Sequence, residues 1–145
     1  MQFPPPLIFV GAFVLGLGLQ RVTPGFVWPS SLEVPGVVVA SLGLLLMLVS
    51  VGLFWSRRTP VLPNKPVTEF VVVGPYKFTR NPMYLGMSVA HLGLLLAFGP
   101  VWPLVFLPVA MFLVARFVIR REEAYLLRTF GDSYEQYCSR VRRWI

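Results

Sequence analysis

The stretch Gly74-Pro-Tyr-Lys-Phe-Thr-Arg-Asn-Pro-Met-Tyr-Leu-Gly86 leads directly into a long apolar segment. Gly74-Pro75 predicts a turn, and Lys77 with Arg80 places positive charge at a membrane surface. Asn81-Pro82 has the pattern of a helix N-cap followed by proline at the first helical position. A polar connection is therefore expected to enter a membrane-spanning helix. The first N–H groups of that helix, beside Arg80, would suit an anion such as a carboxylate.

The composition of the whole chain is typical of a small integral membrane protein. Of its 145 residues 56% are hydrophobic, whereas soluble domains contain about 45–50% apolar residues. The net charge of +7 comes from basic residues beside apolar runs, which favours anchoring at a membrane surface over nucleic-acid binding. One cysteine, Cys138, excludes an internal disulfide, and with one histidine, His91, no metal site is predicted.

Four apolar runs are long enough to predict membrane-spanning helices. They cover approximately residues 5–19, 35–55, 82–98 and 101–119. The first run follows no charged segment and precedes no small-residue cleavage site, so we interpret it as a retained span. Neither of the first two runs contains an ionisable residue, which is typical of scaffold and lipid contact. In the fourth run, Pro108 is expected to kink the helix.

The distribution of basic residues predicts the orientation of the chain in the membrane. Residues 56–81 and the C-terminal tail hold nearly all the Lys and Arg, whereas the connection between the third and fourth spans holds none. The positive-inside rule then places both termini and residues 56–81 in the cytoplasm. We expect a single multi-pass domain, residues 1–145, in the inner or plasma membrane of a prokaryote, with residues 1–55 as a two-span scaffold.

The tail after the fourth span is predicted to form cytoplasmic amphipathic helices. Three apolar residues share one helix face at about 100° per residue: Ile119, Leu126 and Phe130. Glu122 and Glu123 lie on either side of that face, whereas Arg121 and Arg128 lie opposite. The fold class predicted from the whole chain is therefore an all-α membrane protein of about four transmembrane helices with amphipathic helices after them.

Two interpretations of the acidic pair stay open. Glu123 can pair with Arg120 on a solvated helix, which contributes only about 0.2–0.5 kcal/mol. A carboxylate on the apolar side instead needs a partner there, and a ligand with hydroxyl or amino donors would supply one. Beyond this helix, Gly131 is expected to end it, and Asp132-Ser-Tyr-Glu135 is expected to form a capping box that opens a second short helix.

A polar stripe is predicted inside the third span. Tyr84, Ser88 and His91 follow the spacing i, i+4, i+7 and therefore share one helix face. Polar groups at membrane depth usually face a cavity or the interior of a helix bundle. The histidine either forms a hydrogen bond between packed helices or lies in a substrate channel, and the sequence leaves both interpretations open.

The motifs of the C-terminal half resemble those of the isoprenylcysteine carboxyl methyltransferases and the related phospholipid methyltransferases. They are Gly74-Pro-Tyr76, Arg80-Asn-Pro-x-Tyr-x-Gly86, Arg121-Glu-Glu-x-x-Leu126, Phe130-Gly-x-x-Tyr134-x-x-Tyr137 and Val141-x-Arg-Trp-Ile145. The resemblance implies a membrane-embedded methyltransferase that uses S-adenosylmethionine, with residues 56–145 as the cofactor-binding and catalytic half. A lipophilic substrate would enter from the bilayer. The best-known members of the family carry histidine where this chain has Asn81.

The resemblance and the chemistry of methyl transfer together assign candidate roles. Transfer from a sulfonium is an in-line displacement that depends mainly on positioning and on exclusion of water. The candidate catalytic residues are Arg80, Tyr84 and Glu123. The candidate cofactor-binding residues are Gly74, Tyr76, Arg80, Asn81, Pro82, Met83, Tyr84, Glu122, Glu123 and Tyr134. Ser88 and His91 are candidates for a substrate channel.

Within the candidate site, each type of group has an expected partner on the cofactor. Arg80 and the helix start at residues 81–83 would hold its carboxylate, and Glu122 or Glu123 its ribose or amino donors. Tyr84 and Tyr134 would form walls around the sulfonium.

The function expected from the sequence is methyl transfer from S-adenosylmethionine to a lipophilic or membrane-partitioning acceptor at the cytoplasmic face. The acceptor atom stays open. Two alternatives are a small membrane transporter, which would normally need an ionisable group inside the first spans, and a non-catalytic scaffold that retains the fold. No nucleic-acid or metal partner is expected.

Overall fold

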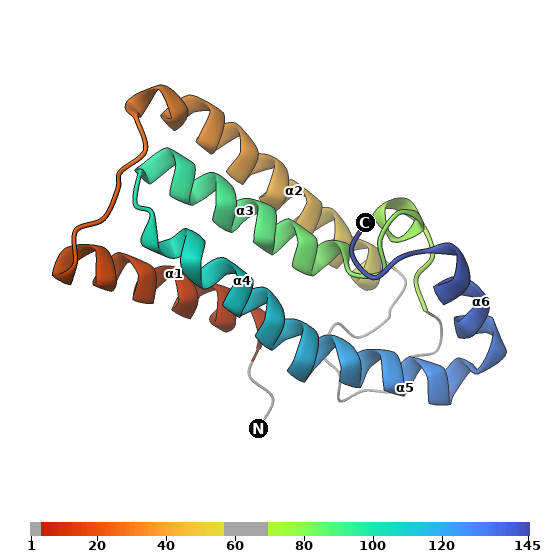
Figure 1. Ribbon diagram of the computed structural model, residues 1–145. Helices are drawn as coiled ribbons and strands as arrows, with labels where there is room; N and C mark the ends of the chain where they lie inside the picture. The colour runs from red at the N-terminus through yellow and green to blue at the C-terminus, as the bar shows by residue number, and fades with distance from the viewer. Residues whose placement is uncertain (1–3, 57–69) are drawn as a thin grey trace.

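The computed structural model describes residues 4–56 and 70–145, and the elongated bundle that these residues form is helical (Figure 1). The long helices are α1 (Pro5–Val22), α2 (Glu33–Ser56), α3 (Pro82–Phe98) and α4 (Trp102–Val114). The chain continues through α5 (Arg120–Phe130) and α6 (Asp132–Arg140). Short helical turns are η1 (Ser30–Leu32), η2 (Gly74–Lys77) and the π-helical η3 (Ala115–Ile119). The predicted all-α class is confirmed.

Three helical segments are long and apolar enough to cross a membrane. They are Pro5–Val22, Ser30–Ser56 and Trp102–Phe130, and the third predicted span, Pro82–Phe98, forms a shorter apolar helix. These are the helices of an integral membrane protein. Most of the predicted connection between the second and third spans, residues 57–69, lies outside the described residues.

The pairing of α2 with α3 depends on glycine. A Cβ atom added at Gly86 would lie 2.7 Å from the Gly43 carbonyl oxygen, and one added at Gly43 would lie 2.7 Å from the Gly86 carbonyl oxygen. The two backbones therefore approach as closely as small residues allow, which is a common way for membrane helices to associate. This contact fixes α3, whose first turn enters the candidate site.

The other side of the bundle pairs α1 with α4. A Cβ atom added at Gly16 of α1 would overlap Pro103 in the first turn of α4. The buried core shared by these helices and α3 includes Phe9, Tyr84, Leu107, Val114 and Ile119. Figure 1 shows α3 and α4 between α1 and α2.

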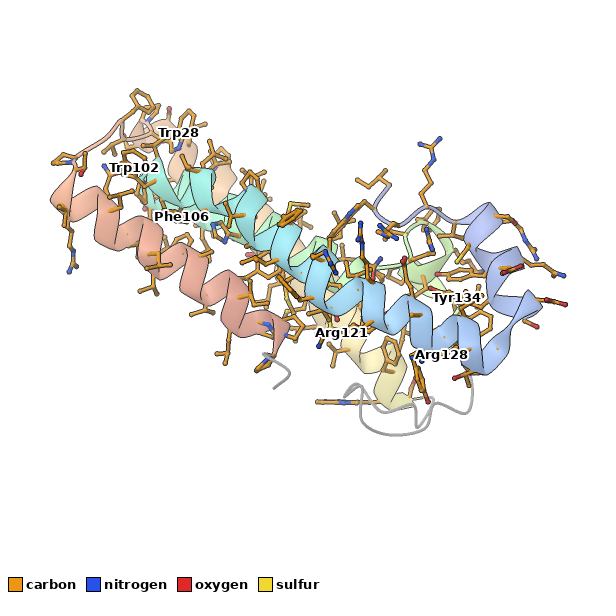
Figure 2. The ribbon with its side chains drawn as sticks, turned by 60° about the horizontal axis from the view of Figure 1, so that its bottom comes forward. Trp28, Trp102, Phe106, Arg121, Arg128 and Tyr134 are labelled. Carbon is orange, nitrogen blue, oxygen red and sulfur yellow. The ribbon has the colours of Figure 1, made fainter. Side chains whose placement is uncertain are left out.

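Aromatic residues tie the loops together at one end of the bundle. The Trp102 indole N–H donates to the Thr23 carbonyl oxygen at 2.7 Å, and the Trp28 backbone N–H donates to the Gly99 carbonyl oxygen at 2.8 Å. Gly99 ends α3 with φ of 86°, a conformation that favours glycine. Figure 2 shows Trp28 and Trp102 at this end, and Arg121 and Tyr134 toward the other.

The fourth predicted span does not stop at Ile119. Pro108 lies within α4 without ending it, and a π-helical segment then leads directly into α5. A π-helical turn is wider than an α-helical one and is frequent near functional sites. The membrane-spanning helix α4 and the amphipathic helix α5 are therefore continuous.

Candidate functional site

The candidate site lies where the start of α3 meets the C-terminal tail. The Arg80 backbone N–H donates to the Arg142 carbonyl oxygen at 2.9 Å, and the Thr79 hydroxyl donates to the Arg143 carbonyl oxygen at 3.1 Å. The Asn81 side-chain amide donates to the same Arg143 oxygen at 3.0 Å. Three hydrogen bonds thus hold residues 142–143 against the beginning of α3.

The same contacts change the predicted role of Asn81. Asn81 is the N-cap residue of α3 and Pro82 its first residue, as predicted, but the Asn81 side chain makes no capping hydrogen bond. The position of the N-cap is confirmed, while the Asn81 amide is turned toward the Arg143 carbonyl instead of the helix N–H groups. Asn81 and Pro82 are also buried, whereas Met83 is half-buried, and anion binding at this helix start stays a prediction.

Two arginines, Arg80 from the segment just before α3 and Arg143 from the tail, converge on Glu123 of α5. Its carboxylate accepts two hydrogen bonds from Arg143, at 3.0 Å from Nε and 2.6 Å from Nη2. Arg80 Nη1 lies 3.2 Å from Glu123 Oε1. The hydrogen bonds to Glu123 raise the pKa of the Arg143 guanidinium, so Arg143 stays charged. Glu123 therefore pairs across the fold, and not with Arg120 along its own helix.

A cavity of about 590 Å³ borders this network. Its wall is formed by Arg80, Arg120, Glu123, Ala124, Leu127, Tyr134, Glu135, Cys138 and Arg143. Arg80 Nη1 also donates to Cys138 Sγ at 2.9 Å, whereas its buried Nε finds no hydrogen-bond partner among the described residues. Because sulfur is a weak acceptor, the Arg80 guanidinium keeps donor capacity for a ligand in this wall.

An aromatic cluster supports the cavity from the side of α6. The Phe70 ring lies 5.0 Å from that of Phe130 and 5.7 Å from those of Tyr134 and Tyr137, measured between centroids. The Tyr137 hydroxyl donates to the Tyr76 carbonyl oxygen at 2.7 Å. Burial raises the pKa of Tyr137 to about 12, so this hydroxyl stays protonated and the bond persists at neutral pH.

Glu122 projects to a different side of α5 from Glu123. The Tyr84 hydroxyl of α3 donates to Glu122 Oε1 at 2.8 Å. Both acids therefore point toward packed helices, as the helical periodicity predicts, while Arg121 and Arg128 are exposed (Figure 2). The two neighbouring carboxylates have separate environments, and of the two only Glu123 lines the cavity.

The turn between α5 and α6 lacks the side-chain capping that the sequence predicts. Gly131 ends α5 as expected, but it is also the N-cap of α6, with φ of 50°. The N–H groups of Tyr134 and Glu135 bond to the Gly131 carbonyl oxygen, and no side chain caps the helix. The predicted capping box at Asp132 and Glu135 is wrong, because glycine takes a left-handed conformation there that favours it. The resulting turn brings Tyr134 back toward Arg80.

The polar side chains that form the stripe on α3, Tyr84, Ser88 and His91, make hydrogen bonds within the bundle. His91 Nε2 lies 2.9 Å from the Pro103 carbonyl oxygen of α4, and its ring meets that of Phe13 edge-on at 5.0 Å. The Ser88 hydroxyl donates to the Tyr84 carbonyl oxygen on its own helix. The contacts of His91 are those of the helix-packing interpretation, and its place in a channel stays a prediction.

The structure brings together some of the residues that the sequence singled out. Of the candidate cofactor-binding residues, Arg80, Glu123 and Tyr134 line the cavity. Those outside its wall are Gly74, Tyr76, Asn81, Pro82, Met83, Tyr84 and Glu122. Gly74 and Tyr76 form the η2 turn, with the Tyr76 ring buried against Phe54.

Sequence reasoning missed two residues that contact Arg80 or its partner. Arg143 was part of a quoted motif but had no assigned role, and Cys138 was considered only for disulfides and metals. The spacing of Arg143 from Glu123 and Asn81 gives no local signal. The pairing of Arg143 with Glu123 could have been suspected only because a partly buried carboxylate needs a cationic partner.

Comparison with known proteins supports the resemblance of the motifs. A family model described as phospholipid methyltransferase matches residues 38–133. Protein-S-isoprenylcysteine O-methyltransferase of Schizosaccharomyces pombe is 35% identical over 71 residues, which cover 49% of this chain and 30% of that enzyme. An uncharacterized protein of Haemophilus influenzae is 40% identical over 63 residues, which cover 43% of this chain and 79% of that protein.

No solved structure matches the chain. The family match spans more than half of the sequence and includes most of the second predicted span, the third and fourth spans, α5 and the Gly131 turn. This chain therefore belongs to the phospholipid methyltransferase family, with distant homology to isoprenylcysteine O-methyltransferase.

Proposed function

We propose that the protein transfers a methyl group from S-adenosylmethionine to a lipophilic acceptor at the cytoplasmic face of the membrane. Family membership supports the class of reaction. The observation that carries the proposal is the cavity between α5, α6 and the tail, whose wall contains the charged side chains of Arg80, Glu123 and Arg143. Guanidinium groups in such a wall favour an anionic ligand group.

The residues of the cavity fit the proposed cofactor. A volume of about 590 Å³ is within the range of about 300–1,000 Å³ usual for small-molecule sites. Arg80 would bind the carboxylate of the cofactor through charge-assisted hydrogen bonds. Tyr134 supplies an aromatic wall suited to a sulfonium.

Glu123 retains room for a donor from the ligand. A carboxylate offers about four lone-pair sites; Arg143 donates one hydrogen bond to each oxygen, and Arg80 lies at ion-pair distance from Oε1. The remaining site on Oε2 can accept a hydrogen bond from the amino or ribose groups of the cofactor. Glu122 already accepts from Tyr84, so we assign this pair to positioning α5 against α3.

The bound cofactor would supply a methyl group on a positively charged sulfur. The chain contributes binding and orientation: Arg80 fixes one end of the ligand, Glu123 a second group, and Tyr134 limits access of water. The aromatic cluster behind Tyr134 keeps its ring in place. A site that only binds and orients the cofactor is sufficient for methyl transfer, because this reaction needs little acid–base chemistry.

The continuity of α4, η3 and α5 supports an acceptor that arrives from the bilayer. One uninterrupted helical path runs from the apolar span to the cavity wall. A lipid or amphipathic small molecule could follow this helix to the membrane surface. We further propose residues 56–145 as the catalytic half of a single membrane domain, residues 1–55 as its scaffold, and cytoplasmic placement of both termini.

Turnover tests this function. The purified protein, reconstituted in vesicles, would be incubated with S-adenosylmethionine labelled in the transferred methyl group and with total lipid extract. Label is expected in the lipid phase, and an Arg80→Gln variant should lose most of it. Binding of the cofactor without label transfer to any lipid would favour the scaffold alternative, and no binding at all would contradict the proposal.

A further inference from the structure

Glu123 has two cationic partners that hold it unequally. Arg143 makes a two-point contact, with Nε at 3.0 Å and Nη2 at 2.6 Å from the two carboxylate oxygens. Arg80 makes one contact, at 3.2 Å. Two-point arginine–carboxylate pairs are the stronger and more geometrically specific kind. The charge of Glu123 is therefore compensated mainly by Arg143.

The geometry points to Arg143 as a positioning residue that keeps Arg80 available for the carboxylate of a bound ligand. This inference rests on the proposed function. Arg143 satisfies Glu123, so Arg80 does not have to turn both its terminal nitrogens toward that acid. Arg80 Nη1 makes both the ion pair with Glu123 and the hydrogen bond to the weak acceptor Cys138 Sγ, so the contact with Glu123 uses one of the two terminal nitrogens of this guanidinium.

The backbone of the tail fixes Arg143 where this role requires it. Its carbonyl oxygen accepts hydrogen bonds from Thr79 and Asn81, the two neighbours of Arg80 in sequence. Arg80 itself bonds to the adjacent carbonyl of Arg142. Arg80 therefore contacts Glu123, Glu123 contacts the Arg143 side chain, and the Arg143 carbonyl oxygen accepts hydrogen bonds from the two residues on either side of Arg80. Because these tail contacts use backbone carbonyls, they survive a change of the Arg143 side chain.

Removing the Arg143 charge should leave Glu123 to compete for Arg80. In Arg143→Gln the acid loses its two-point partner, and the remaining guanidinium beside it is that of Arg80. A ligand carboxylate would then have to displace Glu123 before it could bind. The loss should affect only ligands that carry the carboxylate.

Two ligands that differ in one group isolate this effect. S-adenosylhomocysteine carries the carboxylate, and its decarboxylated amine analogue lacks it. Calorimetry on the detergent-purified protein gives the ratio of the two affinities, which we define as the carboxylate preference. We expect Arg143→Gln to reduce this preference by about 10-fold or more. Arg143→Lys should preserve part of it, since the charge is retained without the two-point geometry.

Two further variants complete the test. Arg142→Gln removes an exposed neighbouring charge and should leave the preference unchanged. Glu123→Gln combined with Arg143→Gln removes the competing acid and should restore the preference, even if overall affinity stays low. Melting curves recorded for each variant separate a change in preference from a loss of fold.

The possible outcomes distinguish this inference from the proposed function. If the parent protein binds S-adenosylhomocysteine but Arg143→Gln weakens both ligands equally, Arg143 has a structural role and only the inference is overturned. The same conclusion follows if Arg143→Gln fails to fold and Arg143→Lys, stably folded, shows the full parental preference. If the parent protein binds neither ligand, both the inference and the proposed function fall.

Discussion

Asn81 Nδ2 donates a hydrogen bond to the Arg143 carbonyl oxygen at 3.0 Å, across 62 positions of the sequence. The amide that would ordinarily cap α3 is thereby used to hold the tail, and the tail in turn supplies the side chain that pairs with Glu123. One contact between two segments thus links the beginning of a membrane helix to the cavity wall.

Asn81→Ala should destabilise the protein and loosen the tail. The Arg143 carbonyl would keep its bond from Thr79 but lose the one from the amide, at a cost of about 0.5–1.5 kcal/mol. Thermal unfolding in detergent would measure this loss, with Gln136→Ala on the exposed side of α6 as the matched control. Equal stability of the Asn81 variant and the control would show that the contact contributes nothing measurable.

Gly86→Ala should separate α2 from α3. The added methyl would lie 2.7 Å from the Gly43 carbonyl oxygen, so the helices must move apart. A cost of about 1–3 kcal/mol is expected for such overpacking.

Gly18→Ala provides the control for this helix contact, because a Cβ atom there would meet nothing within 4 Å. Thermal melting should rank Gly86→Ala well below Gly18→Ala. If the two variants melted at the same temperature, the close approach of α2 and α3 would not be a determinant of stability.

The two neighbouring acids should behave differently when each is neutralised. Glu123→Gln removes the charge from a residue that lines the cavity and should weaken cofactor binding about 10- to 150-fold, as expected for charge-assisted hydrogen bonds. Glu122→Gln weakens a bond between α3 and α5 and should chiefly lower the melting temperature.

Arg128→Gln, on the exposed side of α5, is the control for the acids and should change neither property. Cofactor titration and melting of the three variants would check this order. An equal effect of all three on binding would indicate a general dependence on membrane anchoring instead of specific contacts.

The bounds of α3 illustrate what the sequence could predict. Its start at Pro82 and end at Phe98 match the prediction, because an Asn-Pro start and a Gly-Pro end leave few other conformations. The inward direction of Glu122 and Glu123 likewise follows from helical periodicity, which is a local property.

The contacts of the tail could not be predicted in the same way. Residues 142–143 meet α3 and α5 only after the chain reverses at Gly131, and the geometry of that turn decides which side chains meet. Local rules favoured Asn81 and Asp132 as caps. In the structure the Asn81 amide donates to the Arg143 carbonyl oxygen of the tail. Gly131, and not Asp132, is the N-cap residue of α6.

Orientation in the membrane can be tested with single cysteines in a Cys138→Ser background. Ser133 on α6 and Ser30 at the opposite end of the bundle are both exposed. The positive-inside rule predicts that a membrane-impermeant thiol reagent labels Ser30→Cys in intact cells, and Ser133→Cys only after permeabilisation. Labelling of both from the same side would contradict the proposed orientation.

Binding of S-adenosylhomocysteine to the purified protein tests the central claim most directly, since it requires no knowledge of the acceptor. At 100 times its dissociation constant the ligand should stabilise the parent protein by about 2.7 kcal/mol, and Arg80→Gln should abolish most of that gain. Saturating ligand that gives neither heat in calorimetry nor a shift of the melting curve would contradict the account.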